Sequence, residues 1–351
     1  MRPLHLESGP LGARLRPRVA ATAAALVLAG FATLVASVSL GTFSLPVADV
    51  LGALFGTGSG DADLIVHQLR LPRALTALLV GAAFGTAGAV YQAVTRNPLA
   101  SPDLIGISAG AGAGAVGAIL IGGVTAAGSG TFGAVPFGAL AGALATATVI
   151  YLLAWRGGTI TGYRFVLVGI AANGALAALT RWMLARADID QAARAMVWLT
   201  GSLNGRSYDH VQWVGLALLL LVPLTVALAR AYQLLQFDDD TALTLGIRIG
   251  RARIALLLLA TCLAALATAA AGPVAFIALG APQIARRLAG TAGIPLLLSG
   301  LTGAVLLLLA DLTARLVFSP TELPVGIITG AVGAPYLLLL LARANRAGKG
   351  G

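Results

Sequence analysis

The sequence predicts an all-α, polytopic membrane protein with about ten transmembrane helices, because of its composition, its recurring apolar stretches and its glycine content. Of the 351 residues, 58% are hydrophobic and only 10% are charged, and the mean hydropathy is +0.92, which a water-soluble core does not need. Apolar stretches recur from residue 19 to residue 342, which predicts a single transmembrane domain over residues 1–351. The 45 glycines predict close helix packing, since small residues let helix backbones approach each other in lipid.

Ten apolar windows are long enough to cross the hydrocarbon core of a bilayer. They lie near residues 19–40, 71–94, 104–124, 134–154, 165–185, 211–231, 254–271, 274–290, 296–316 and 324–342. The first window is longer than a signal-peptide core, so we expect an uncleaved first helix. Only Gly272-Pro273 separates the seventh window from the eighth, which leaves one kinked helix as the alternative there. Between the fifth and sixth windows, residues 187–209 and Trp198 predict an interfacial helix.

The distribution of basic residues predicts the orientation in the membrane. Of the 23 lysines and arginines, 16 fall on the side of the two termini and 7 on the other side. The positive-inside rule then places both termini in the cytoplasm, with tails at residues 1–18 and 343–351 and a cytoplasmic loop at 232–253. Because the basic residues are scattered singly, the net charge of +10 indicates topology and a lipid environment, not nucleic-acid binding.

The sequence offers no candidate catalytic, cofactor-binding or metal-binding residue. The only lysine, Lys349, is followed by Gly350, so no phosphate-binding P-loop can form. His5, His67 and His210 lie far apart and lack a carboxylate or cysteine at metal-ligand spacing, and we expect His210 to be solvated in an outer loop. A transporter with this sequence needs a partner that supplies energy.

The predicted spans contain almost no ionisable groups near their centres, which disfavours an ion-driven secondary transporter or a channel. Asp311 is the deepest acidic residue, and Arg315 follows it four positions later, so the two can pair on one helix face. A membrane scaffold or sensor without transport activity is a further alternative.

Three regions resemble the cobalamin and ferric-siderophore permease family of ABC importers, the FecCD-type family. They are LRLPRALTALLVGAAFGTAGAVYQAVTRNPLASPDLIGISAGAGAGA at 69–115, DDDTALTLGIRIGRAR at 238–253 followed by GPVAFIALGAPQIARRLAG at 272–290, and ADLTARLVFSPTELPVGIITGAVGAPYLLLLLAR at 310–343. The resemblance implies a type II ABC importer permease fold, without a cofactor, that moves an iron-siderophore-type chelate. Cobalamin and haem are the alternative substrates within the same family.

The resemblance also implies the partners and the location. We expect cytoplasmic ATP-binding-cassette ATPase subunits, an extracytoplasmic solute-binding protein and a second permease copy, in a homodimer or a paralogous heterodimer. The location implied is the inner (plasma) membrane.

The resemblance implies that three arginines dock the solute-binding protein by pairing with its glutamates. They are Arg70, Arg73 and Arg315. An arginine at the bilayer centre costs about 2.5–3.5 kcal/mol on insertion scales, so we expect these side chains at the membrane rim or in water. The alternative for each is an interaction with lipid headgroups.

A cytoplasmic gate is implied at Asn97, Pro98 and Leu99. Proline has no N–H to donate and disfavours helical geometry at the preceding residue, so a helix must end here. Simple helix termination is the alternative interpretation.

The segment 238–253 resembles the family's coupling loop, which docks on the ATPase. A run of aspartates precedes a short predicted helix at 241–245, where carboxylates favour the helix N-terminus, and a glycine can end it. The residues assigned to coupling are Asp240, Ala242, Leu243, Leu245 and Gly246. A solvated connector is the alternative.

Overall fold

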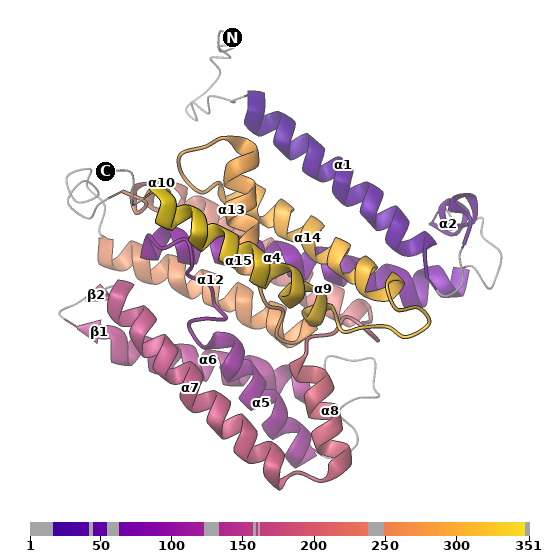
Figure 1. Cartoon of the computed structure of the whole chain (residues 1–351), viewed down its shortest axis with the longest axis horizontal. Coiled ribbons are helices and arrows are strands. Elements are labelled where there is room, and N and C mark those ends of the chain that lie inside the picture. Colours follow the sequence, from indigo (N-terminus) through magenta and orange to yellow (C-terminus); the bar gives the residue numbers. More distant parts are fainter. Residues whose placement is uncertain are drawn as a thin grey trace.

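The structure is a computed structural model that describes residues 17–41, 45–54, 63–122, 133–156, 159–160, 162–237 and 249–347. Within these ranges the chain is almost entirely helical (Figure 1), which confirms the all-α class. The strands in the described part are β1 (Trp155–Arg156) and β2 (Thr159–Ile160), which form a short antiparallel pair.

The helices follow each other along the chain with short connections. In order they are α1 (Pro17–Ser39), α2 (Val47–Leu54), η1 (Ile65–Arg70, a π-helix), α4 (Leu71–Thr95), α5 (Ile107–Gly122), α6 (Ala134–Ala154), α7 (Gly162–Arg186), α8 (Ile189–Leu199), α9 (Tyr208–Ala227), α10 (Ala229–Leu234), α12 (Ile249–Ala271), α13 (Ile277–Ala289), α14 (Leu296–Leu316) and α15 (Val325–Ala347). Helices α5 to α8 form one group, while α1 and α2 lie on the opposite side of α4 and α14 (Figure 1).

Each of the ten predicted apolar windows contains a helix, but these helices differ in length. Among the described residues, seven helical segments are long and apolar enough to cross a membrane: α1, η1 with α4, α6, α7, α9, α12 and α14. Helices α5 and α15 contain shorter apolar stretches, and α13 has 13 residues with polar and apolar faces. The count of ten spans therefore stays a prediction.

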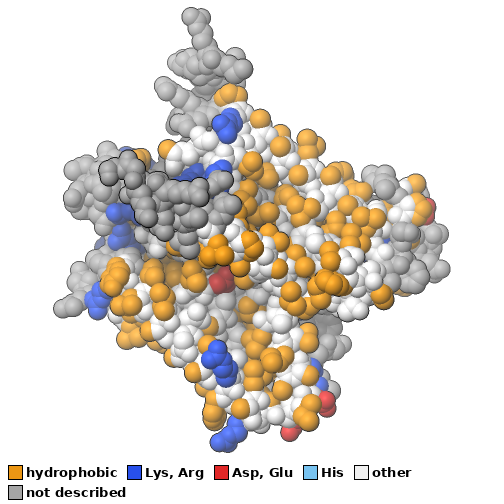
Figure 2. Space-filling view, in the orientation of Figure 1, with side chains coloured by type: hydrophobic (Ala, Val, Ile, Leu, Met, Phe, Trp, Pro, Cys, Tyr) orange, Lys and Arg blue, Asp and Glu red, His pale blue; other side chains and the backbone are white. Residues whose placement is uncertain are grey.

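Helix α4 is the central element of the fold. It packs against α14, α12, α13 and α9, and 78% of the apolar window in Ile65–Thr95 is buried, compared with 17% in α1 and in α7. The 25 residues of α4 span ~37 Å at the rise of an α-helix, which exceeds a hydrocarbon core of about 30 Å. Helix α4 is therefore long enough to cross this core. Apolar side chains cover much of the face in Figure 2, and most visible basic side chains lie toward its margins.

Glycines allow α4 to touch its neighbours through backbone atoms, as the glycine content predicts. A Cβ at Gly81 would lie 2.3 Å from the carbonyl oxygen of Gly303, and one at Gly85 would lie 2.2 Å from that of Ser299, both on α14. A Cβ at Gly88 would lie only 1.8 Å from the carbonyl oxygen of Ala278 on α13. No side chain fits between the helices at these points, so the glycines fix how closely they approach.

A buried group of hydroxyls joins α4, α6 and α12. The Tyr91 hydroxyl lies 2.6 Å from Thr261 Oγ1, and the Tyr151 hydroxyl lies 2.8 Å from the same atom. The Phe165 ring stacks on both tyrosine rings. Each buried hydroxyl thus has a partner, which avoids the cost of an unsatisfied polar group in the core.

Several helix boundaries agree with the sequence, while others are shifted. Helix α12 ends at Ala271 and Gly272 has a φ of 76°, so the two predicted spans on either side are separate helices. Helix α12 begins at residue 249, inside the predicted loop 232–253, and α15 continues through residues 343–347 of the predicted tail; the cytoplasmic position of both segments stays a prediction. These segments extend apolar helices that hydrogen-bond their own backbone. An amphipathic helix, α8, lies within the predicted interfacial stretch.

Candidate functional site

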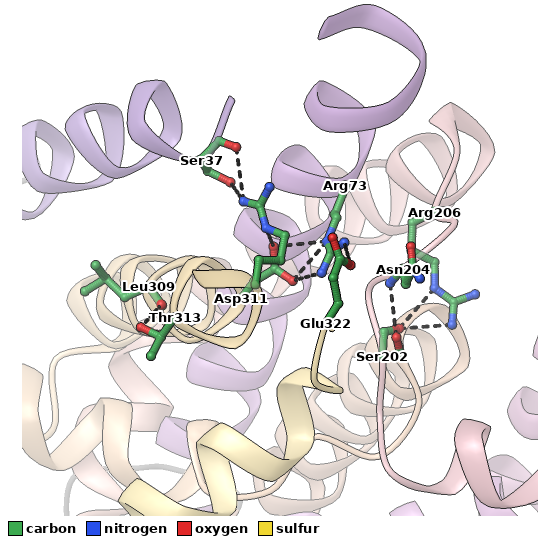
Figure 3. Close-up of polar contacts among 10 residues, drawn as sticks. Ser37, Arg73, Ser202, Asn204, Arg206, Leu309, Asp311, Thr313 and Glu322 are labelled. Carbon is green, nitrogen blue, oxygen red and sulfur yellow. Dashed lines mark hydrogen bonds and ion pairs between the residues drawn. The ribbon is translucent and has the colours of Figure 1, made fainter. Parts of the chain in front are cut away.

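A cluster of charged residues lies where α4 begins and α14 ends (Figure 3). The Arg73 guanidinium donates from Nε to both Asp311 oxygens, at 3.1 and 3.2 Å, and from Nη2 to Asp311 Oδ1 at 2.9 Å. Its Nη1 donates to Glu322 Oε2 at 2.6 Å. Asp311 is 0% exposed. A buried carboxylate with several charge-assisted hydrogen bonds holds α4 and α14 together at this end.

Two further arginines of this cluster bind the last turn of α1. Arg315 Nη2 donates to the carbonyl oxygen of Ser37 at 3.1 Å and to the Ser37 hydroxyl. Arg70 Nη1 donates to the carbonyl oxygens of Val38 and Ser39, at 2.7 and 3.0 Å. The last carbonyls of a helix lack intrahelical partners and carry partial negative charge, so these arginines satisfy and neutralise the end of α1.

The structure brings the three predicted docking arginines together, but two of them are buried. Arg73 is 8% exposed and Arg315 is 7% exposed. These two side chains are therefore not free in water, and Asp311 and Glu322 offset the cost of burying their charges; a place at the membrane rim, the other part of our expectation, stays a prediction. The predicted pairing of Asp311 with Arg315 is confirmed, with Arg315 Nε 3.3 Å from Asp311 Oδ2. Sequence reasoning missed the link from Arg73 to Asp311 and the role of Glu322.

An adjacent loop, which we predicted on the outer side, is held by a fourth arginine (Figure 3). Arg206 donates from Nε and Nη2 to the Ser202 carbonyl oxygen, at 3.3 and 3.1 Å, and the Asn204 N–H donates to the Ser202 hydroxyl at 3.1 Å. Burial lowers the pKa of Arg206 to about 10. The neighbouring His210 is only 4% exposed and contacts Arg206 and Ser207. Our expectation of a solvated His210 is therefore wrong, since the loop folds over it.

The predicted gate residues form a tight turn at the other end of α4. Arg96 ends the helix with a left-handed φ of 51°. The Asn97 side-chain oxygen then accepts the backbone N–H of Leu99 at 2.9 Å, which is an Asx-turn. Asn97 and Leu99 are half-buried and Pro98 is exposed. The predicted helix break is confirmed, and the gating role stays a prediction.

A pocket of about 740 Å³ adjoins this turn. The lining comprises Gln92, Ala93, Arg96, Pro98, Gln233, Gln236, Phe237, Gln283, Arg286, Thr291, Ala292, Gly293, Ile294 and Pro295. Arg96 Nε donates to the carbonyl oxygen of Leu235 at 3.2 Å. This bond links the predicted gate directly to the end of α10, a few residues before the predicted coupling segment.

A half-buried carboxyl, that of Asp103, follows the turn of Asn97, Pro98 and Leu99. The Ser108 hydroxyl donates to Asp103 Oδ1, and burial raises the pKa of Asp103 to about 6 although this hydrogen bond opposes the shift. The raised pKa exceeds that of an unfolded aspartate, about 3.9. Folding therefore takes up a proton, and the free energy of unfolding falls as the pH rises from about 4 to about 6.

Replacing Asp103 with asparagine is expected to remove this pH dependence. The wild-type protein should lose on the order of 2 kcal/mol more stability than Asp103→Asn between about pH 4 and pH 7. Thermal unfolding of both purified proteins in one detergent, at the two pH values, measures the difference. Asp49→Asn, at an exposed acid of α2, is the control, and an equal effect of the two substitutions would contradict the assignment.

The five residues assigned to coupling lie outside the described residues: Asp240, Ala242, Leu243, Leu245 and Gly246. Within the described part of the chain, no group of three or more His, Cys, Asp or Glu side chains could hold a metal ion.

Comparison with known proteins identifies relatives along nearly the whole chain. A model of the FecCD transport family matches residues 26–343. The ferric enterobactin transport system permease protein FepG of Escherichia coli (strain K12) is 40% identical over 87% of this chain and 91% of its own length. The achromobactin transport system permease protein CbrC of Dickeya dadantii (strain 3937) is 42% identical over 89% of this chain and 88% of its own length.

A solved structure is also similar. It is described as an inward-facing conformation of a metal-chelate type ABC transporter, and it aligns with a TM-score of 0.79 at 26% identity, over 92% of this chain and 99% of the solved chain. These relatives define the class of the chain as a membrane transport permease and not an enzyme. The chain belongs to the FecCD transport family, whose members are the membrane-spanning permeases of ABC importers.

Proposed function

We propose that this permease moves iron-siderophore-type chelates across the cytoplasmic membrane. The observation that carries this substrate class is the set of relatives, whose names specify ferric enterobactin, achromobactin and iron(3+)-hydroxamate transport. Cobalamin and haem are the alternative substrates. The sequence cannot form a P-loop, since its only lysine is Lys349, and in this proposal the energy comes from cytoplasmic ATPase subunits.

The other proposed partners are a solute-binding protein on the outer side and a second permease copy. Substrate passes between the two copies, along a path lined by small and weakly polar side chains that do not retain the chelate. Both termini lie in the cytoplasm, as the positive-inside rule predicts.

In this proposal the arginines at the start of α4 and the end of α14 receive the solute-binding protein. Arg70 is half-buried, and with Arg73 and Arg315 it gives this end of the bundle three positive charges against the two of Asp311 and Glu322. A net positive surface favours a partner that presents carboxylates.

At the opposite end, the turn of Asn97, Pro98 and Leu99 acts as the cytoplasmic gate, and residues 238–253 receive force from the ATPase. Support comes from the hydrogen bond between Arg96 and the carbonyl oxygen of Leu235. It provides a short physical route from the coupling segment to the gate, as coupling between sites requires.

Replacing Gly246 with tryptophan should uncouple ATP hydrolysis from transport. A bulky side chain at the end of the coupling helix prevents its seating in the ATPase groove, so uptake should fall at least tenfold while ATP hydrolysis continues. The assay is uptake of a radiolabelled ferric siderophore into proteoliposomes that hold the assembled importer and internal ATP. Lys349→Ala, at the far C-terminus, is the control.

Two outcomes would contradict the proposal. Uptake that needs no ATPase and collapses with a proton ionophore would indicate a secondary transporter. Uptake of haem or cobalamin but of no ferric siderophore would assign the alternative substrate.

A further inference from the structure

Glu322 is the exposed member of the charged cluster. Its side chain is 33% exposed, whereas that of Asp311 is 0% exposed. Arg73 uses Nε and Nη2 for Asp311 and Nη1 for Glu322. The guanidinium thus has one permanently buried partner and one partner at the surface.

Asp311 alone cannot balance the charge around it. Its carboxylate binds Arg73 at 2.9 Å and also lies 3.3 Å from Arg315 Nε. One negative charge therefore lies beside two buried positive charges, and a second carboxylate is needed to neutralise the other positive charge. Glu322 provides that second carboxylate, at the solvent-facing side of Arg73.

An acidic side chain that approaches Arg73 from outside would compete with Glu322. Arg73 is 8% exposed, and Asp311 occupies the inner side of its guanidinium. Glu322 holds Nη1, the donor on the solvent-facing side. A carboxylate that binds there from outside therefore favours the release of Glu322.

The segment that carries Glu322 leads directly into α15. Residues 317–322 are exposed, including Val317 at 57% and Phe318 at 59%. The Leu323 N–H donates to the carbonyl oxygen of Ala314 at 3.1 Å, and the Gly326 N–H donates to that of Gly201 at 3.1 Å. The Glu322 side chain connects this exposed segment to Arg73 on α4. Loss of this contact therefore makes the chain more mobile just before α15 begins.

We infer that Glu322 is an exchangeable internal carboxylate that occupies Arg73 until an acidic side chain of the solute-binding protein replaces it. The exchange releases residues 317–324 from their side-chain contact with α4. Docking of the solute-binding protein is thereby transmitted to the start of α15. This inference rests on the proposed docking role of Arg73. It assigns a function to Glu322, which no sequence motif singled out.

The test measures binding of the importer's own solute-binding protein, free of substrate, to the assembled importer in nanodiscs. Glu322→Gln removes the competing charge, so the binding protein should bind about tenfold tighter than to the wild type. Thr321→Ala, at the exposed neighbour, should leave affinity unchanged. Unchanged or weaker binding to Glu322→Gln would overturn the inference.

A double-mutant cycle shows whether the effect runs through Arg73. In Arg73→Gln, Asp311 keeps Arg315 as its partner, and adding Glu322→Gln should then change the affinity less than twofold. An equal gain in both backgrounds would mean that Glu322 acts by general repulsion, which also overturns the exchange.

A second measurement uses the permease without its solute-binding protein, and so applies even if a variant does not bind that protein. The chain has one cysteine, so a spin label can be placed at Phe318→Cys in a Cys262→Ala background. The label should become more mobile with Glu322→Gln and not with Thr321→Ala; equal mobility would overturn the inference. If Arg70→Gln and Arg73→Gln each bind the solute-binding protein with the wild-type affinity, the proposed docking role of these arginines fails instead.

Discussion

Replacing Asp311 with asparagine is expected to lower the free energy of unfolding by about 3–5 kcal/mol, the typical cost of breaking a buried ion pair from one side. Asparagine has nearly the same shape, so the loss comes from charge and not from a cavity. Arg73 and Arg315, both less than a tenth exposed, would be left with no buried carboxylate between them. Thermal and denaturant unfolding of the purified permease in one detergent measures the change.

Two further variants make the Asp311 result specific. Asp190→Asn, at an exposed acid in the first turn of α8, should cost less than about 0.5 kcal/mol. Adding Arg315→Met to Asp311→Asn should restore part of the stability, because it removes one unpaired buried charge. Equal losses in Asp311→Asn and Asp190→Asn would show that the buried cluster does not hold α4 to α14.

The relation between the cluster and the sequence shows what local patterns can predict. The spacing of Asp311 and Arg315 predicted their pairing, because residues four apart share a helix face, and the structure confirms the pair. The bond from Arg73 to Asp311 joins residues 238 positions apart. No local pattern specifies that contact, since it depends on how α4 packs against α14.

Breaks in the helices were predictable for a similar local reason. Asn97-Pro98 and Gly272-Pro273 both lie just after helix ends, because proline disfavours helical geometry at the preceding residue. Proline alone is not sufficient, since Pro223, Pro282 and Pro335 lie inside helices. His210 was predicted wrongly because its position in a polar loop suggests solvent. Its hydrogen bonds to Arg206 and Ser207 are local, but its burial accompanies the packing of α9 against α4 and α12, which is a tertiary feature.

The glycine content correctly predicted close helix packing, but it could not say which glycines matter. Gly88 and Gly117 both lie within apolar helices, α4 and α5. A Cβ at Gly88 would lie 1.8 Å from the Ala278 carbonyl oxygen, while a Cβ at Gly117 would meet nothing within 4 Å. Only the packed structure separates these two positions.

Replacing Gly88 with alanine is therefore expected to cost about 3 kcal/mol or more, at the upper end for overpacking a core. The new methyl group must push the backbone of α13 away from α4, and Ala278 has no flexible side chain that could yield instead. Because α13 also carries Gln283 and Arg286 at the pocket beside the predicted gate, the shift should reduce uptake as well as stability. The amount of protein in the membrane, its thermal unfolding and its ferric-siderophore uptake, each compared with the wild type, measure the effect.

Gly117→Ala is the matched control, with the same chemical change in a helix where space is open. It should be neutral or stabilising by up to about 1 kcal/mol, because alanine favours helix more than glycine does. The comparison separates the cost of the steric contact from the gain in helix propensity. Both substitutions gain helix propensity equally, and only Gly88→Ala places a methyl group against a backbone oxygen. If Gly88→Ala were tolerated as well as Gly117→Ala, then α4 and α13 would not approach through Gly88, and the close packing that positions the gate end of α4 would have to arise elsewhere.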